Sequence, residues 1–96
     1  WTWGNNNYGQ LGDGTTTNRD SPVQIGSDTN WQQVTAGSYH SLAIKTDGSL
    51  WAWGRNDDCQ VGASPNTDRH SPVQISTDTE DWKQVTAGSS HSLAMK

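Results

Sequence analysis

The chain has 96 residues, a formal net charge of −4 and only 29% hydrophobic residues. Its 6 Lys and Arg residues are scattered along the sequence, which disfavours binding to nucleic acid or to an anionic membrane surface. No apolar run approaches the roughly 20 residues of a membrane-spanning helix, and the single cysteine, Cys59, excludes an internal disulfide.

The predicted elements, taken in chain order, occur twice. The chain begins with a predicted strand of sequence Trp-x-Trp-Gly, which is followed by a loop with the pattern Asn-x-x-x-Gln-x-Gly. Three segments return in a second copy: residues 1–14 at 51–64, residues 21–25 at 71–75, and residues 34–45 at 85–96. A period of about 50 residues predicts a stacked or circular array of small structural units.

The middle of the chain holds a complete set of predicted strands, each with alternating polar and apolar residues bounded by Gly, Pro, Asn or Ser. The four strands are residues 33–36, 41–45, 50–53 and 72–75. Asp47-Gly48 predicts a two-residue hairpin turn with positive φ at both residues. Pro22 and Pro72 begin the fourth strand of each copy, which places that strand at a sheet edge.

These strands predict an all-β fold in which each unit is a four-stranded antiparallel sheet. Trp51 and Trp53 lie on one face of the third strand, while Leu50 and Ala52 lie on the other. Bulky residues of one sheet can therefore pack against small residues of the next. A lone sheet would leave one face in water, whereas radial repetition, as in a β-propeller, covers both faces.

The repeated motifs resemble a known family. Trp-Ala-Trp-Gly, Ser-Pro-Val-Gln-Ile and Val-Thr-Ala-Gly-x-x-His-Ser-Leu-Ala, at these spacings, resemble the regulator of chromosome condensation repeat in its Trp-rich bacterial form. The resemblance covers two tandem units, residues 1–50 and 51–96. It implies a β-propeller, commonly seven-bladed, with one four-stranded sheet per blade.

The repeats are out of phase with the predicted sheets. The chain is expected to hold half a blade, a full blade at about residues 31–75, and another half blade. Two interpretations follow: the chain is part of a longer propeller protein, or its half blades complete one another between subunits in an oligomeric ring. Open head-to-tail association is also allowed where the rotation does not close.

Residues that recur with the fold are expected to serve the fold. His40 and His91 occupy one repeat position, and a site used once need not recur in every blade, so we expect an imidazole nitrogen to bond backbone. The tryptophans could form an aromatic platform for a sugar or a protein, but their recurrence favours packing between blades. Structural roles are thus predicted for His40, His91, Trp51, Trp53, Gly37 and Gly88.

No motif for catalysis, metal binding or cofactor binding is found in the sequence. There is no nucleophile with a plausible base, no glycine-rich phosphate loop and no zinc spacing of cysteine and histidine. Acidic turns such as Asp57-Asp58 lack the spacing of a calcium loop. We therefore expect a protein without enzyme activity, metal or cofactor.

Positions at which the two copies differ are the candidates for recognition. They are Tyr8, Tyr39, Asp20, Asp58 and His70, all expected in loops, with both tyrosines exposed. This predicts a scaffold for protein–protein interaction. The alternatives are a self-assembling filament or surface-layer module and a guanine-nucleotide exchange factor like the eukaryotic relatives, against which the acidic, Trp-rich character counts. The Asn, Thr, Ser and Gly bias favours an extracellular or cell-surface location.

Overall fold

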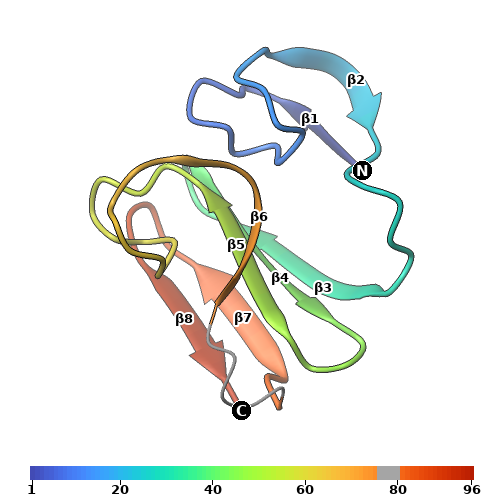
Figure 1. Ribbon diagram of the computed structural model, residues 1–96, viewed down its shortest axis with the longest axis vertical. Helices are drawn as coiled ribbons and strands as arrows, with labels where there is room; N and C mark the ends of the chain where they lie inside the picture. The colour runs from blue at the N-terminus through green and yellow to red at the C-terminus, as the bar shows by residue number, and fades with distance from the viewer. Residues whose placement is uncertain (76–80) are drawn as a thin grey trace.

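The computed structural model describes residues 1–75 and 81–96, and that range holds strands and loops without a helix. The strands are β1 (Thr2–Gly4), β2 (Arg19–Val23), β3 (Trp31–Ala36), β4 (His40–Lys45), β5 (Leu50–Gly54), β6 (Arg69–Ile75), β7 (Gln84–Ala87) and β8 (Ser92–Met95) (Figure 1). The all-β prediction is confirmed.

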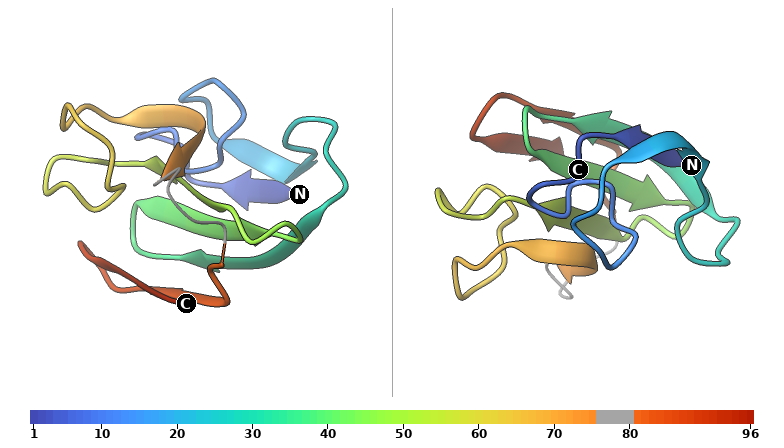
Figure 2. Two further views of the ribbon diagram at one scale, coloured as in Figure 1. Left: turned by 60° about the horizontal axis from the view of Figure 1, so that its bottom comes forward. Right: turned by 90° about the horizontal axis from the view of Figure 1, so that it is seen from above.

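Three antiparallel sheets share these strands. The central sheet has four strands in the order β3-β4-β5-β6, while β1-β2 and β7-β8 are two-stranded. Figure 2 shows the two small sheets on opposite sides of the central sheet. The described residues therefore adopt the predicted order of half blade, full blade and half blade.

The outer strand of the central sheet begins earlier than predicted. β6 starts at Arg69, because its pairing with β5 continues through a register shift between Ala52 and Gly54. Pro72 thus lies inside β6, in the stretch without a register partner, where the missing N–H interrupts no ladder hydrogen bond. As a consequence, His70 lies on β6 and Asp20 lies on β2, rather than in loops as expected.

The β4–β5 turn also differs from the predicted one. The N–H of Gly48 donates to the carbonyl of Lys45 at 2.9 Å, so Thr46 and Asp47 are the central residues. Only Gly48 has positive φ, at 84°, which makes this a three-residue hairpin loop that ends in a left-handed glycine. The Asp47 carboxylate accepts hydrogen bonds from the Ser49 N–H and hydroxyl, at 2.9 and 2.6 Å, and needs no left-handed backbone of its own.

The hydrophobic core lies on one side of the central sheet, beneath β7-β8. Its buried members are Leu42, Ile44, Leu50, Ala52, Val61 and Val85. Leu42 is paired with Ala52 across β4 and β5, so the two side chains share this face, which we call the β7-facing side. The opposite face carries Val34, Ala43 and Trp51, which are register neighbours, and we call it the β1-facing side.

A tryptophan cluster covers part of the β1-facing side. The ring of Trp31 lies edge-on to Trp51 and Trp53, with centroids 6.0 and 6.1 Å apart. The Lys45 ammonium lies 4.7 Å from the Trp31 ring centroid and 4.2 Å from that of Trp51, and it pairs with Asp28 at 2.7 Å. The largely buried lysine is therefore held by two aromatic faces and a carboxylate.

Candidate interaction site

Two tyrosines and an arginine form a surface cluster where the first half sheet meets the central sheet. The rings of Tyr8 and Tyr39 are 5.0 Å apart at 61°. The Arg55 guanidinium lies 5.3 Å from the Tyr8 centroid and 5.9 Å from that of Tyr39. Tyr39 is exposed as predicted, but Tyr8 is half-buried because its ring packs against these two neighbours. We call these three residues the Tyr-Arg cluster.

The loop that carries Tyr8 is built around the buried amide of Asn6. This side chain accepts a hydrogen bond from the Leu11 N–H at 3.0 Å. Its Nδ2 shares two protons among nearby oxygens, which include Asp13 Oδ1 at 3.1 Å and the Thr15 and Thr17 carbonyls at 3.0 Å each. Asn56 takes the same place in the second copy and accepts from the Val61 N–H at 3.0 Å. The Asn of the repeated pattern therefore fixes the loop that connects β1 to β2 and the equivalent loop that connects β5 to β6.

Asp13 is the second anchor of the first loop. Burial by itself raises the pKa of this carboxyl, but hydrogen bonds from Thr15 and Arg19 outweigh burial and lower the pKa to about 2. The Arg19 Nε atom lies 2.8 Å from Asp13 Oδ2. The second loop has Ala63 at the Asp13 position, and the Nε of Arg69 is buried without a partner among the described residues.

Tyr39 and Arg55 are joined through their backbones. The Gly37 N–H donates to the His40 carbonyl at 2.8 Å, which closes the β3–β4 turn that presents Tyr39. The Arg55 N–H donates to the Tyr39 carbonyl at 2.8 Å. This approach requires a glycine before Arg55, because a Cβ on Gly54 would lie 2.6 Å from the Tyr39 oxygen.

A carboxylate holds the guanidinium of the Tyr-Arg cluster. Arg55 Nε donates to Asp57 Oδ2 at 3.3 Å, and this hydrogen bond helps to raise the pKa of Arg55 although desolvation opposes the shift. Asp58 adds a further negative charge near Arg55 and is exposed. The arginine therefore stays charged beneath two partly exposed aromatic rings.

The next boundary between sheets lacks this chemistry. By repeat position, Asp58 and Ser90 stand where Tyr8 and Tyr39 stand at the first boundary. Both line the same surface hollow between the β5–β6 loop and the β7–β8 turn. The two aromatic rings are thus specific to one boundary and are not required by the fold.

The other two candidate residues lie outside the Tyr-Arg cluster. His70 is exposed on β6, where its carbonyl accepts from the Gly14 N–H at 2.8 Å and its Cα lies close to Gly9. Asp20 is exposed on β2. Of the five residues selected by comparing the two copies, Tyr8 and Tyr39 meet, Asp58 adds charge beside them, and the other two lie elsewhere.

His40 lies buried at the boundary between the central sheet and β7-β8. The Ser92 hydroxyl donates its proton to the Gln60 carbonyl at 2.6 Å, so His40 Nε2 is the donor in its own 3.0 Å hydrogen bond to Ser92 Oγ. The partner is a hydroxyl of the neighbouring half sheet, where a backbone group was expected. Burial lowers the pKa of His40 despite a contact with the His91 backbone.

Among the other residues that recur in both copies, two glycines lie where a side chain would not fit, and two tryptophans are held by hydrogen bonds. A Cβ on Gly37 would collide with the His40 ring and with the Gly88 carbonyl, and a Cβ on Gly88 would collide with the His91 ring. Trp53 is buried, and its Nε1 donates to the Gln10 carbonyl at 2.8 Å. Trp51 is half-buried and donates to Ser49 Oγ at 2.9 Å.

The described residues hold neither a cluster of metal-ligating side chains nor a long apolar helix. Residues 1–75 and 81–96 contain no group of three or more His, Cys, Asp or Glu side chains that could hold a metal ion. Within the same residues no helix has the length and apolarity needed to cross a membrane. Cys59 is exposed, and its backbone takes the left-handed φ of 62° that the first copy fills with Gly9.

Arg55 is the functional candidate that sequence reasoning missed. Its counterpart in the first copy is Asn5, so it too stands where the copies differ. That difference was available as a signal, but the contact with Tyr8 joins loops of two different sheets and does not follow from strand patterning.

Comparison with known proteins adds a family and a set of structures. A family model described as the regulator of chromosome condensation (RCC1) repeat matches residues 1–44 and 47–95, and another of the same description matches residues 31–60. The chain is similar to yeast RCC1 (Prp20), solved bound to Kap60, with 26% identity, a TM-score of 0.81 and 96% of this chain covered.

Two further structures resemble the chain. One is Prp20p from Saccharomyces cerevisiae, whose structure was described with its binding properties to Gsp1p and histones, at 28% identity, a TM-score of 0.72 and 96% coverage. The other is human WBSCR16, at 24% identity, a TM-score of 0.79 and 97% coverage, which supports the fold alone. The chain spans only 24%, 25% and 24% of the length of the Kap60-bound Prp20, the Prp20p and the WBSCR16 chains.

Proposed function

The chain belongs to the regulator of chromosome condensation repeat family, and from that premise we propose that it is a non-enzymatic scaffold that binds a protein partner through the Tyr-Arg cluster. The propeller sheets hold the loops rigidly, and the loop residues that differ between repeats make the contact. Rigid presentation lowers the ordering cost of association.

Protein partners are consistent with what the similar structures contain. Yeast RCC1 was solved with Kap60, and Prp20p was studied with Gsp1p and histones. These partners belong to those proteins, and their identities are not transferred to this chain. What they support is the class of partner.

The observation that carries the proposal is the composition and position of the Tyr-Arg cluster. Tyrosine and arginine are enriched among residues that dominate protein–protein binding energy. Tyr39 is 39% exposed, so a partner could still bury much of its ring. Because the rings are already packed against each other and against Arg55, little side-chain entropy would be lost on binding.

The proposal includes the absence of catalysis. The carboxyl group of Asp13 and the imidazole ring of His40 are buried and have shifted pKa values. Both groups are engaged in hydrogen bonds that hold loops and sheets together. Perturbed groups of this kind mark structural networks as well as active sites. Cys59 lies on the surface of a turn rather than in an enclosed site.

The test is a comparative interaction measurement with two double variants. Tyr8→Ala with Tyr39→Ala removes both rings, and Thr16→Ala with Ser90→Ala changes two exposed loop positions outside the Tyr-Arg cluster. Each tagged chain, with the unaltered chain, is cross-linked in extract of its source cells, and recovered proteins are quantified by mass spectrometry.

The expected result is that at least one partner falls by about tenfold with the tyrosine variant, a loss of about 1.4 kcal/mol, and is retained by the control variant. Equal recovery of every partner with all three chains would refute the role of the Tyr-Arg cluster. Unchanged circular dichroism and unfolding midpoints check that both variants are folded.

A further inference from the structure

Two exposed carboxylates border the Tyr-Arg cluster. The side chain of Asp57 is 57% exposed and meets Arg55 at 3.3 Å, which is long for a charge-assisted hydrogen bond. Asp58 is exposed, and its negative charge acts on Arg55 from nearby. Within residues 1–75 and 81–96, no ion pair engages Asp58. One cation therefore stands beside two carboxylates, and the surface next to the tyrosines carries a net negative charge.

The loop that carries these carboxylates has a fixed backbone. The Asp58 N–H donates to Oε1 of the buried Gln60 at 2.9 Å, and the Cys59 N–H donates to the Asn56 carbonyl at 3.1 Å. Asn56 is itself buried and accepts from the Val61 N–H at 3.0 Å. The carboxylates thus project from an ordered turn, so a partner that binds them orders little additional chain.

The other arginines at this end of the strands are already engaged. Arg19 begins β2 and Arg69 begins β6. Arg19 pairs with Asp13 at 2.8 Å, whereas Arg69 Nη2 donates to the Ser64 and Pro65 carbonyls at 3.1 and 3.3 Å. Among the described residues, neither arginine forms an ion pair with the carboxylates beside the tyrosines.

The lysines of the chain lie at the opposite end of the sheets. The β3–β4 and β7–β8 turns meet at the end that carries the cluster, where Ser38 Oγ donates to Ser89 Oγ at 3.3 Å. Lys45 is the last residue of β4, while Lys83 precedes β7 and Lys96 follows β8. The ammonium groups are therefore separated from the cluster by the length of the strands.

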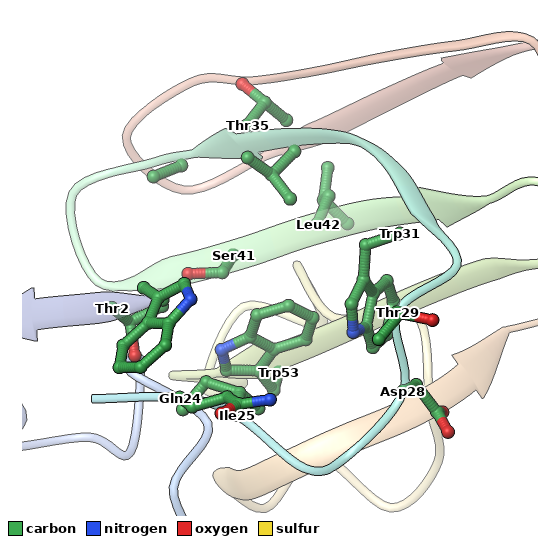
Figure 3. A pocket seen from close by; sticks show the side chains of 13 residues that line it. Thr2, Gln24, Ile25, Asp28, Thr29, Trp31, Thr35, Ser41, Leu42 and Trp53 are labelled. Carbon is green, nitrogen blue, oxygen red and sulfur yellow. The ribbon is translucent and has the colours of Figure 1, made fainter. Parts of the chain in front are cut away.

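A carboxylate at that opposite end is neutralised within the chain. Figure 3 shows Asp28 among the residues that line a hollow of about 570 Å³ with tryptophan rings in its wall. Its side chain is 56% exposed, close to the 57% of Asp57, yet its Oδ2 atom lies 2.7 Å from the Lys45 ammonium. Exposure alone does not leave a carboxylate without a close cation, so the excess negative charge is specific to the end that carries the tyrosines.

From these charges we infer that the Tyr-Arg cluster, together with Asp57 and Asp58, binds a protein segment that presents Lys or Arg side chains. The inference rests on the proposed function and names the chemistry of the partner. A long basic side chain fits because its apolar stem can lie on the exposed part of Tyr39 while its charged head reaches a carboxylate. An acidic segment would instead meet two like charges, and the side chain of Arg55 is only 29% exposed.

Selection of peptides tests the sign of the partner's charge. Random dodecapeptides displayed on phage are selected on the unaltered chain and counter-selected against Tyr8→Ala with Tyr39→Ala, so that the retained peptides need the tyrosine rings. The retained peptides should be enriched in Lys and Arg relative to the starting library.

Two results of the selection would overturn the inference. Retained peptides that are neutral or acidic would do so while the proposed function still stands. A selection that retains no peptide would also do so, and the cross-linking experiment described above then decides the proposed function by itself.

Charge reversal at Asp58 tests the contact directly. Binding of the retained peptides is measured by fluorescence anisotropy. Asp58→Lys should weaken it by about tenfold because a repulsion replaces an attraction, whereas Asp58→Glu should bind like the unaltered chain. Raising the salt concentration from about 50 mM to about 500 mM should weaken binding to the unaltered chain several-fold, since exposed charges are screened.

The matched control is Asp81→Lys, which makes the same change of charge at an exposed position. Asp81 precedes Trp82, whose N–H donates to the Gly48 carbonyl in the β4–β5 turn, at the end of the sheets away from the cluster. This variant should bind the peptides within about twofold of the unaltered chain. Circular dichroism checks that both variants are folded, as expected for two exposed positions. Equal affinities of Asp58→Lys and Asp81→Lys would overturn the inference.

Discussion

The hairpins β3-β4 and β7-β8 have nearly the same sequence and very different environments. His40, Leu42 and Ile44 of β4 are buried, whereas their repeat counterparts are exposed: His91, which precedes β8, and Leu93 and Met95 of β8. The backbone turns agree: the Gly37 N–H donates to the His40 carbonyl as the Gly88 N–H does to the His91 carbonyl. Local sequence therefore determines the hairpin, and the next sheet determines whether its residues are core or surface.

This difference locates the stabilising contacts at the boundaries between sheets. In repeat proteins, stability is approximately a sum of terms within units and terms between neighbours. Identical residues at equivalent positions should then contribute unequally, which the paired variants below measure.

The largest expected effect separates the two histidines. His40→Ala removes a buried ring and leaves the Ser92 hydroxyl without its donor, so we expect a loss of about 3 kcal/mol in the free energy of unfolding. His91→Ala should change it by less than about 0.5 kcal/mol, because this ring is exposed. Urea unfolding followed by tryptophan fluorescence gives both values, and similar losses would contradict control by the neighbouring sheet.

The next effect separates Gly9 from Cys59, which share a repeat position and a left-handed backbone. Gly9→Ala should cost about 2 kcal/mol, since its Cβ would lie 2.7 Å from the His70 Cα, and left-handed φ adds strain. Cys59→Gly should instead stabilise by up to about 1 kcal/mol by relieving that strain. Thermal unfolding in reducing buffer measures both changes, and destabilisation by Cys59→Gly would show that the thiol makes an essential contact.

The third comparison is between Asp13, which anchors the β1–β2 loop, and Ala63, its counterpart in the β5–β6 loop. The pKa of Asp13 is lowered from 3.8 to about 2, so its contribution to stability is present above pH 3.8 and is lost as the pH falls toward 2. Asp13→Ala should cost on the order of 2 kcal/mol at neutral pH, and it should flatten the acid limb of the stability profile. Ala63→Asp should gain about 1 kcal/mol by giving Arg69 a carboxylate, and a loss there would refute the equivalence of the loops.

The smallest expected effect is the pH dependence of the sheet boundary. Burial lowers the pKa of His40 from 6.5, so the unfolded chain binds this proton more readily than the folded chain. Stability should therefore be complete above pH 6.5 and should decline as the pH falls from 6.5 toward the folded pKa. His40→Gln should remove this slope in urea midpoints measured against pH, while His91→Ala should retain it.

Much of the fold could be predicted because a period of two reports directly on strands. The alternation around Leu42 and Ile44 predicted β4, and the recurrence of the same residues predicted its counterpart in the second repeat, β8. The start of β6 was predicted too late, at Pro72. An edge strand tolerates a proline beside a register shift, and the sequence does not reveal that shift. The β4–β5 turn was wrong for a similar reason, since Ser49 stabilises Asp47 without a left-handed backbone.

The candidate site was predictable only in part. Differences between the copies selected Tyr8 and Tyr39, and the structure brings these rings together. The same differences also selected Asp20 and His70, which lie apart on strands. Whether two variable residues meet depends on how one sheet stacks on the next, and Arg55 was missed because its contacts exist only across that stack.

The offset between the sequence repeat and the sheet has a consequence for how such proteins grow. The central sheet takes β3 and β4 from one repeat and β5 and β6 from the next, joined by the β4–β5 ladder. A duplicated repeat is therefore joined to its neighbour by main-chain hydrogen bonds between paired strands, which side-chain substitution does not remove. Duplication can then lengthen the array while the joints survive sequence drift, and new repeats are free to diverge in their loops.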